Sequence, residues 1–122
     1  MCRILVVDDD TDILSVMEIL LTMNGFKVEV TAKGENTVPK INSFKPDLIL
    51  LDVLISGYDG RTICKQLKSN KATQHIPVIM FSAHPGAAAT IADYGANDFI
   101  AKPFDVTHLL KKVNEQLGIS PN

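Results

Sequence analysis

Acidic, hydroxyl and basic side chains follow four short apolar segments of this 122-residue chain. These residues are Asp8, Asp9 and Asp10 after 4–7, Asp52 after 47–51, Ser82 after 76–81, and Lys102 after 98–101. Grouped carboxylates raise one another's pKa unless a cation is present, and hard oxygen ligands with open positions suit Mg²⁺. A lysine and a hydroxyl beside such a site can hold a phosphoryl anion, and a carboxylate can itself be the nucleophile that forms an aspartyl phosphate.

Each of these residues also has an ordinary structural explanation when it is considered alone. A single aspartate after a strand, such as Asp10 or Asp12, is typical of a helix N-cap or a turn. An isolated Lys102 or Ser82 is typical of a surface or loop position. Two adjacent carboxylates at the end of a buried strand are different, because their burial costs free energy. The chemistry therefore requires a fold that brings the four segment ends together.

The hydrophobic pattern alternates between strand and helix periods. Strands are expected at 4–7, 26–30, 47–51, 76–81 and 98–101, and helices at 13–24, 35–44, 60–69, 87–94 and 106–117. Continuous apolar runs are typical of strands buried on both faces, whereas the alternation over 26–30 suits a strand near a sheet edge. Pro39 indicates that its helix either starts late or is kinked.

This alternation predicts an α/β fold, with a doubly wound parallel sheet of five strands, helices on both faces and right-handed crossovers. We expect a single domain over residues 1–122, because no linker or internal repeat interrupts the pattern. In such a sheet the carboxyl ends of the strands lie on one rim, where ligands bind. The polar residues that follow the strands are therefore predicted to meet there.

Composition restricts the class of protein. Lys and Arg total 12 and Asp and Glu total 14, so the net charge of −2 gives no reason to expect nucleic acid or an anionic membrane as a partner. Cys2 and Cys64 form no CxxC motif, which argues against a disulfide framework or a zinc site. No apolar run approaches the roughly 20 residues of a membrane span, and the N-terminus lacks a signal-peptide pattern. We expect a soluble, cytoplasmic protein.

The chain resembles a response-regulator receiver domain of two-component signalling systems over essentially all of its length. The stretches that carry the resemblance are ILVVDDD (4–10), PDLILLDVLISGYDG (46–60), IPVIMFSA (76–83) and ANDFIAKPF (96–104). The resemblance implies a flavodoxin-like sheet with strand order 2-1-3-4-5, which agrees with the hydrophobic pattern.

The resemblance also implies a role for each residue on the rim. Asp52 is the expected phosphoacceptor. Asp8 and Asp9, with Asp52 and the backbone carbonyl of Leu54, are expected to hold Mg²⁺ directly or through water. Ser82 is expected to hydrogen-bond the phosphoryl group.

The end of the fifth strand has a matching set of roles in the family. Lys102 is expected to pair with a phosphoryl oxygen, and the Lys102–Pro103 peptide bond is a candidate for the cis form. Phe99 occupies the position of the family's aromatic switch, although it lacks the hydroxyl of the tyrosine that is frequent there.

The sequence departs from the family pattern near the expected phosphorylation site. Ser56 replaces a frequent proline, while Gly57 and Gly60 preserve the turn-forming residues. Leu54 and His84 occupy two variable positions that tune dephosphorylation in the family. The apolar Leu54 cannot position an attacking water, whereas His84 is either a solvated loop residue or an influence on hydrolysis.

The resemblance implies a phosphorylation-operated signalling switch, not an enzyme beyond its own aspartyl phosphorylation and dephosphorylation. A sensor histidine kinase or histidine phosphotransfer protein would donate to Asp52, and the surface of the fourth helix, fifth strand and fifth helix would change. A phosphorelay intermediate that passes the group to a histidine phosphotransfer domain is the alternative. The chain is either a single-domain regulator that acts on a target protein or part of a longer protein with a fused output domain.

Two classes with related chemistry fit the sequence less well. A flavin-binding protein needs a loop rich in Ser, Thr and Gly after the first strand, but Asp8, Asp9 and Asp10 would repel a flavin phosphate there. A phosphatase of the haloacid-dehalogenase type fits the DxD formed by Asp8 and Asp10, but the chain is short for that fold and carries no cap domain.

Overall fold

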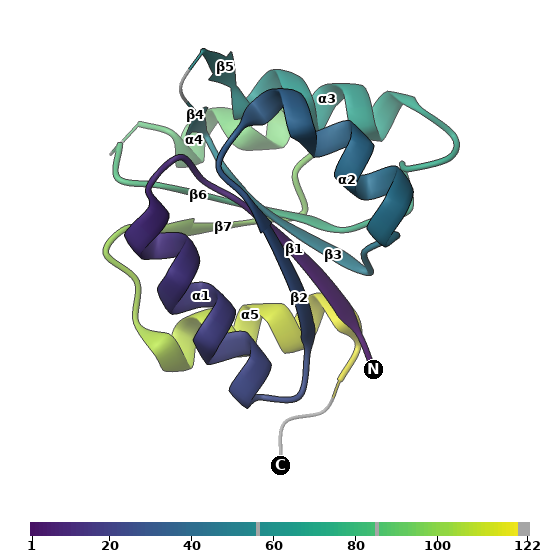
Figure 1. Cartoon of the computed structure of the whole chain (residues 1–122). Helices are drawn as coiled ribbons and strands as arrows, with labels where there is room; N and C mark the ends of the chain where they lie inside the picture. The colour runs from purple at the N-terminus through teal and green to yellow at the C-terminus, as the bar shows by residue number, and fades with distance from the viewer. Residues whose placement is uncertain (56, 85, 120–122) are drawn as a thin grey trace.

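A parallel sheet with strand order β2-β1-β3-β6-β7 forms the centre of the computed structural model (Figure 1). Its strands are β1 (Arg3–Val7), β2 (Lys27–Thr31), β3 (Leu48–Asp52), β6 (Val78–Ser82) and β7 (Asp98–Ala101). The structure describes residues 1–55, 57–84 and 86–119. Because β6 and β7 are the fourth and fifth strands of this sheet along the chain, the predicted order 2-1-3-4-5 is confirmed.

Helices cover both faces of the sheet (Figure 1). The helices α1 (Thr11–Met23) and α5 (Val106–Leu117) pack on one face. The helices α2 (Thr37–Phe44), α3 (Gly60–Ser69) and the short α4 (Ala88–Ile91) pack on the other. No helix in the described residues is long and apolar enough to cross a membrane.

The two hydrophobic cores explain why the strands are apolar at successive positions. Successive side chains of a strand point to opposite faces of the sheet. In β1, Leu5 and Val7 belong to the core beneath α2 and α3, whereas Ile4 and Val6 belong to the core beneath α1 and α5. All four residues are fully buried, so the strand has no face for a polar side chain until it reaches the rim.

Three parts of the structure differ from the elements predicted by the hydrophobic pattern or define them more closely. A 3₁₀ turn, η1 (Gly34–Asn36), precedes α2, so the helix starts late and Pro39 lies in its first turn. The predicted helix over 87–94 is a single turn, α4, that continues as the 3₁₀ turn η2 (Ala92–Tyr94) and ends at Gly95 with φ +84°. A small antiparallel pair, β4 (Leu54–Ile55) and β5 (Tyr58–Asp59), lies between β3 and α3 and was not predicted.

Gly60 begins α3 at a point where no side chain fits. Its N–H donates to the carbonyl of Val53 at 2.7 Å, and a Cβ atom on residue 60 would collide with the backbone carbonyl oxygen of Asp52. The chain therefore turns back on the end of β3 through a contact between two backbones. This contact holds the segment that follows Asp52 close to the rim.

We predict that Gly60→Ala lowers the free energy of unfolding by about 2 kcal/mol, because the added methyl group must displace backbone rather than a flexible side chain. Urea denaturation followed by circular dichroism measures the change. Gly86→Ala is the matched control, since a Cβ atom at Gly86 has no neighbour within 4 Å. Equal denaturation midpoints for the two variants would contradict the prediction.

Candidate functional site

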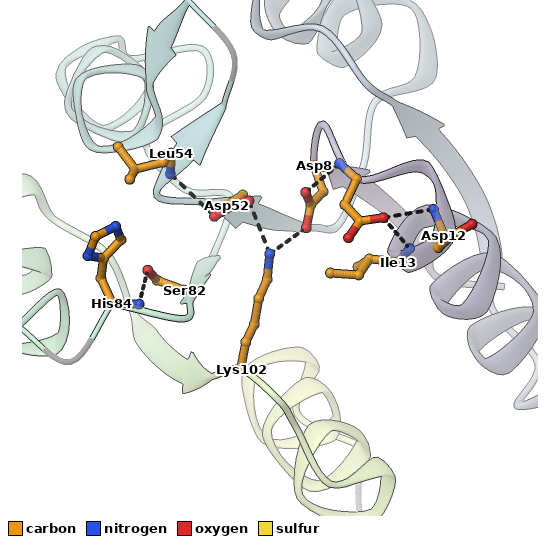
Figure 2. Close-up of polar contacts among 9 residues, drawn as sticks. Asp8, Asp12, Ile13, Asp52, Leu54, Ser82, His84 and Lys102 are labelled. Carbon is orange, nitrogen blue, oxygen red and sulfur yellow. Dashed lines mark hydrogen bonds and ion pairs between the residues drawn. The ribbon is translucent and has the colours of Figure 1, made fainter.

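The carboxyl ends of four neighbouring strands bring the predicted residues to one rim of the sheet (Figure 2). Asp52 and Ser82 are the last residues of β3 and β6, while Asp8 and Lys102 directly follow β1 and β7. Asp8, Asp52 and Ser82 are buried, with at most 6% of each residue exposed. The parallel topology thus assembles residues that are far apart in the sequence.

Lys102 joins the two buried carboxylates of the rim. Its Nζ donates to Asp8 Oδ2 at 2.8 Å and to Asp52 Oδ2 at 3.1 Å (Figure 2). The same nitrogen lies 4.8 Å from the centroid of the Phe81 ring, so the ammonium group rests against an aromatic face. One lysine therefore compensates two carboxylates that are shielded from water.

Burial sets the electrostatics of this group. Burial raises the pKa of Asp8 to about 6, although hydrogen bonds from Lys102 and the amide of Asp10 act in the opposite direction. Burial alone would lower the pKa of Lys102, but its hydrogen bonds to Asp8 and Asp52 outweigh that effect and raise the pKa. The ionised form of Asp8 is thus costly, and a further cation at the rim would stabilise it.

Asp9 completes a cluster that can hold such a cation. Carboxylate oxygens of Asp8, Asp9 and Asp52 all lie within 4.8 Å of one another. Asp9 is exposed while the other two are buried, so the cluster opens to solvent on one side. Hard oxygen donors with an open side suit Mg²⁺, which retains water ligands and accepts phosphate oxygens. The residues present therefore fit the metal that the sequence implied.

The first residue of β4 also contacts the carboxylate of Asp52. The amide of Leu54 donates to Asp52 Oδ1 at 3.3 Å, so both carboxylate oxygens accept hydrogen bonds (Figure 2). The side chain of Leu54 is about half exposed, and His84 on the opposite loop is exposed as well. Ser56, the third departure from the family pattern near this site, lies outside the described residues.

Ser82 lies on the same rim, and its hydrogen bonds are to backbone amides of the segments that follow β6 and β7. Its Oγ accepts from the amide of His84 at 3.0 Å (Figure 2). Its backbone carbonyl accepts from the amide of Lys102 at 2.9 Å. Within residues 1–55, 57–84 and 86–119, it makes no hydrogen bond to Asp52. The structure thus brings Asp8, Asp9, Asp52 and Lys102 together and leaves Ser82 beside them.

Other predicted residues fall at definite places around the rim. Phe99 lies in β7 beside Met80, is half-buried, and packs against the core beneath α2 and α3. The Lys102–Pro103 bond is cis, as expected. Asp10 caps α1 by accepting from the amides of Asp12 and Ile13 at 3.0 and 3.4 Å. Asp12 is therefore not the cap and lies in the first turn of the helix.

An apolar groove beside Lys102 was not predicted. Its cavity, of about 540 Å³, is lined by Lys102, Ile13, Val16, Phe104 and Val106 among others. Val16 and Val106 are about half exposed, and Ile19 lies further along α1 with 61% exposed. The sequence does contain an indication of this groove. Helix α1 carries apolar residues outside the stripe that faces the core, and packing against the core does not require them.

A family model described as the response regulator receiver domain matches residues 4–114, so the chain belongs to that family. Its fold is the flavodoxin-like receiver fold. The receiver domain of NtrX from Brucella abortus superposes with a TM-score of 0.86 at 31% identity, covering 96% of this chain and 99% of that chain. Receiver domains of response regulators are signalling switches that typically bind Mg²⁺ and are generally partnered by histidine kinases.

Curated relatives are longer than this chain. The DNA-binding dual master transcriptional regulator RpaA of Synechocystis is 37% identical over 119 residues, covering 96% of this chain and 49% of RpaA. The response regulator PleD of Caulobacter vibrioides is 38% identical over 113 residues, covering 91% of this chain and 25% of PleD. The chain thus spans half or less of the length of these relatives.

We predict that Mg²⁺ stabilises the folded chain through the cluster of Asp8, Asp9 and Asp52. At a tenfold excess over its Kd, the stabilisation is about 1.4 kcal/mol, which raises Tm by roughly 5 °C. Differential scanning calorimetry measures the shift. Asp9→Ala should lose most of it, whereas Asp12→Ala, which alters an exposed carboxylate outside the cluster, should retain it. A full response in Asp9→Ala would move the metal site elsewhere.

Proposed function

We propose that this chain is a phosphorylation-operated switch in which Asp52 accepts a phosphoryl group from a phosphohistidine of a partner kinase. The observation that supports this most is the double hydrogen bond of Lys102 to Asp8 and Asp52 beside a third carboxylate. The arrangement supplies a nucleophile, a fixed positive charge and oxygen ligands for a metal at one rim of the sheet. If Lys102 only formed structural ion pairs with Asp8 and Asp52, the third carboxylate, Asp9, which faces the solvent, would not be required.

In this proposal Asp8, Asp9 and Asp52, with the backbone carbonyl of Leu54, hold Mg²⁺. When bound, Mg²⁺ neutralises negative charge on the transferring phosphoryl group. The open side of the cluster at Asp9 is where the phosphoryl oxygens have room to approach. The buried side, at Asp8, is where Lys102 already provides a positive charge.

The transfer itself uses a carboxylate oxygen of Asp52. That oxygen attacks the phosphorus, a P–O bond forms, and the P–N bond to the donor imidazole breaks with its electron pair left on the nitrogen. The amide of Leu54 and the ammonium of Lys102 hold the two carboxylate oxygens in place before the attack. The acyl phosphate carries about 1.5 to 2 negative charges, whereas the ionised carboxylate that it replaces carried one.

We propose that Lys102 and Ser82 bind the newly added phosphoryl group. Lys102 pairs with a phosphoryl oxygen, and Ser82 donates its hydroxyl to another. Ser82 is on β6, and the ring of Phe99 lies on the adjacent strand β7 beside Met80. Movement of Ser82 toward the phosphoryl group frees space for Phe99 to turn inward, and the surface of α4, β7 and α5 then changes its preference among partners.

The partners follow from the same proposal. The phosphodonor is a histidine kinase or a histidine phosphotransfer protein, and it docks along the apolar groove because that groove is continuous with Lys102 at the site.

We propose that residues 1–122 form one receiver domain, since the match to the family covers 4–114. The need for a kinase that uses ATP implies a cytoplasmic location.

We predict that Asp52→Asn abolishes phosphorylation, because the amide keeps the shape of the side chain but is not a nucleophile. The wild-type chain should gain the mass of one phosphoryl group when it is incubated with phosphoramidate and Mg²⁺, as measured by intact mass spectrometry. Asp12→Asn serves as the control and should be labelled like the wild type. Acid-labile incorporation at the wild-type rate in Asp52→Asn would refute the assignment.

We predict that Lys102→Ala still accepts the phosphoryl group, but that phosphorylation of this variant no longer changes the structure around Phe99 and α4. Amide chemical shifts of residues 53–55 and 86–104, compared between the phosphorylated and unphosphorylated protein, measure the transmission. Wild type should show changes at Phe99 and in α4, whereas Lys102→Ala should show them only next to Asp52. Lys71→Ala, which removes an exposed lysine, is the control. Identical distant shifts in Lys102→Ala and wild type would leave Lys102 as a local charge partner.

A further inference from the structure

Arg61, the second residue of α3, connects that helix to the segment around α4. Its Nη1 donates to Thr90 Oγ1 at 3.2 Å, and its guanidinium carbon lies 5.6 Å from the centroid of the Tyr94 ring. Thr90 lies in α4 and Tyr94 in η2, so Arg61 contacts both turns of the segment. Figure 1 shows α4 and α3 next to each other on the same face of the sheet.

The guanidinium group is fixed in place by Asp59. Arg61 Nε and Nη2 donate to Asp59 Oδ1 and Oδ2 at 3.1 and 2.9 Å, which is a bidentate pair. Asp59 also caps α3 by accepting from the amide of Arg61 at 2.9 Å. The side chains are 27% and 39% exposed, so the fork geometry, rather than charge alone, makes this pair a rigid base for the contact with Thr90.

The segment that Arg61 contacts has few other anchors. Residues 86–95 contain one α-helical turn and one 3₁₀ turn, and only Ala87 and Ile91 among them are buried. Within the part of the chain that the structure describes, the bond from Arg61 to Thr90 is the only side-chain hydrogen bond between α3 and this segment. Short elements with few buried contacts move at low cost.

A hollow in the surface lies between this segment and the proposed phosphorylation site. A cavity of about 250 Å³ is lined by Val53, Leu54, Arg61, His84, Gly86 and Ala87. It is thus bordered by the loops that follow Asp52 and Ser82, by the start of the α4 segment, and by Arg61. This hollow is open to solvent, so the start of the segment can move into it without displacing packed side chains.

We propose that Arg61 is a positioning residue that holds the α4 segment, residues 86–95, against α3 in the unphosphorylated chain and so opposes its rearrangement on phosphorylation. This inference rests on the proposed function. A contact that exists in one of two states shifts the equilibrium toward that state. Loss of the contact must therefore favour the phosphorylated arrangement.

Beryllium fluoride with Mg²⁺ tests this, because it imitates a phosphoryl group on a carboxylate. Isothermal titration calorimetry should give about fivefold tighter binding to Arg61→Ala than to wild type, the size expected for the loss of one ordinary, partly exposed hydrogen bond. Thr90→Val should shift binding in the same direction, because it removes the acceptor and leaves Asp59 and Arg61 in place. Hydrogen exchange of residues 86–95 should accelerate in both variants.

Lys65→Ala is the matched control, since it removes an exposed cation from the same helix. It should bind beryllium fluoride as the wild type does, and the affinity for Mg²⁺ alone should be equal in all four proteins. If Arg61→Ala and Thr90→Val lower Tm without tighter beryllium fluoride binding, Arg61 is merely structural and the inference is overturned. If the wild type itself binds no beryllium fluoride, the proposed function fails, and this inference fails with it.

Discussion

The compensation of two buried carboxylates by one lysine is the interaction on which the rim depends. Asp8 and Asp52 end adjacent strands, so the sheet itself forces their charges together. Lys102 follows β7, which is separated from β3 by β6, and its side chain must cross the end of β6 to reach them. It does so over the ring of Phe81, which offers an apolar and electrostatically favourable surface.

The rest of the fold supplies the conditions for this interaction. Two hydrophobic cores exclude water from both faces of the strands, so water screens the buried charges of Asp8 and Asp52 only weakly. Gly60 returns the chain to the end of β3 with backbone contacts alone, which keeps the loop beside Asp52 short and close. Asp10 starts α1 immediately after the acidic pair and so fixes where that pair lies.

Much of this architecture could be predicted from the sequence, and each feature that could not be predicted has a physical reason. Continuous apolar runs such as 47–51 predict doubly covered strands, and parallel topology then predicts a shared rim. The partner of Ser82 was not predictable, because a hydroxyl has several acceptors and donors within reach. The weak α4 turn was missed because alanine-rich helical periodicity does not distinguish one α turn and a 3₁₀ turn from a full helix. Arg61 was missed because its partner Thr90 is distant in the sequence.

The parallel sheet also constrains how this chain folds. Each of its pairings joins residues far apart along the chain, for example Ile4 with Leu48, and no tight hairpin nucleates the five central strands. The chain must therefore lose conformational entropy by closing long loops before most hydrogen bonds of the sheet can form. We expect folding to take on the order of milliseconds or longer. The arrangement of Asp8, Asp52 and Lys102 at the rim depends on these distant pairings, since the three residues are far apart along the chain.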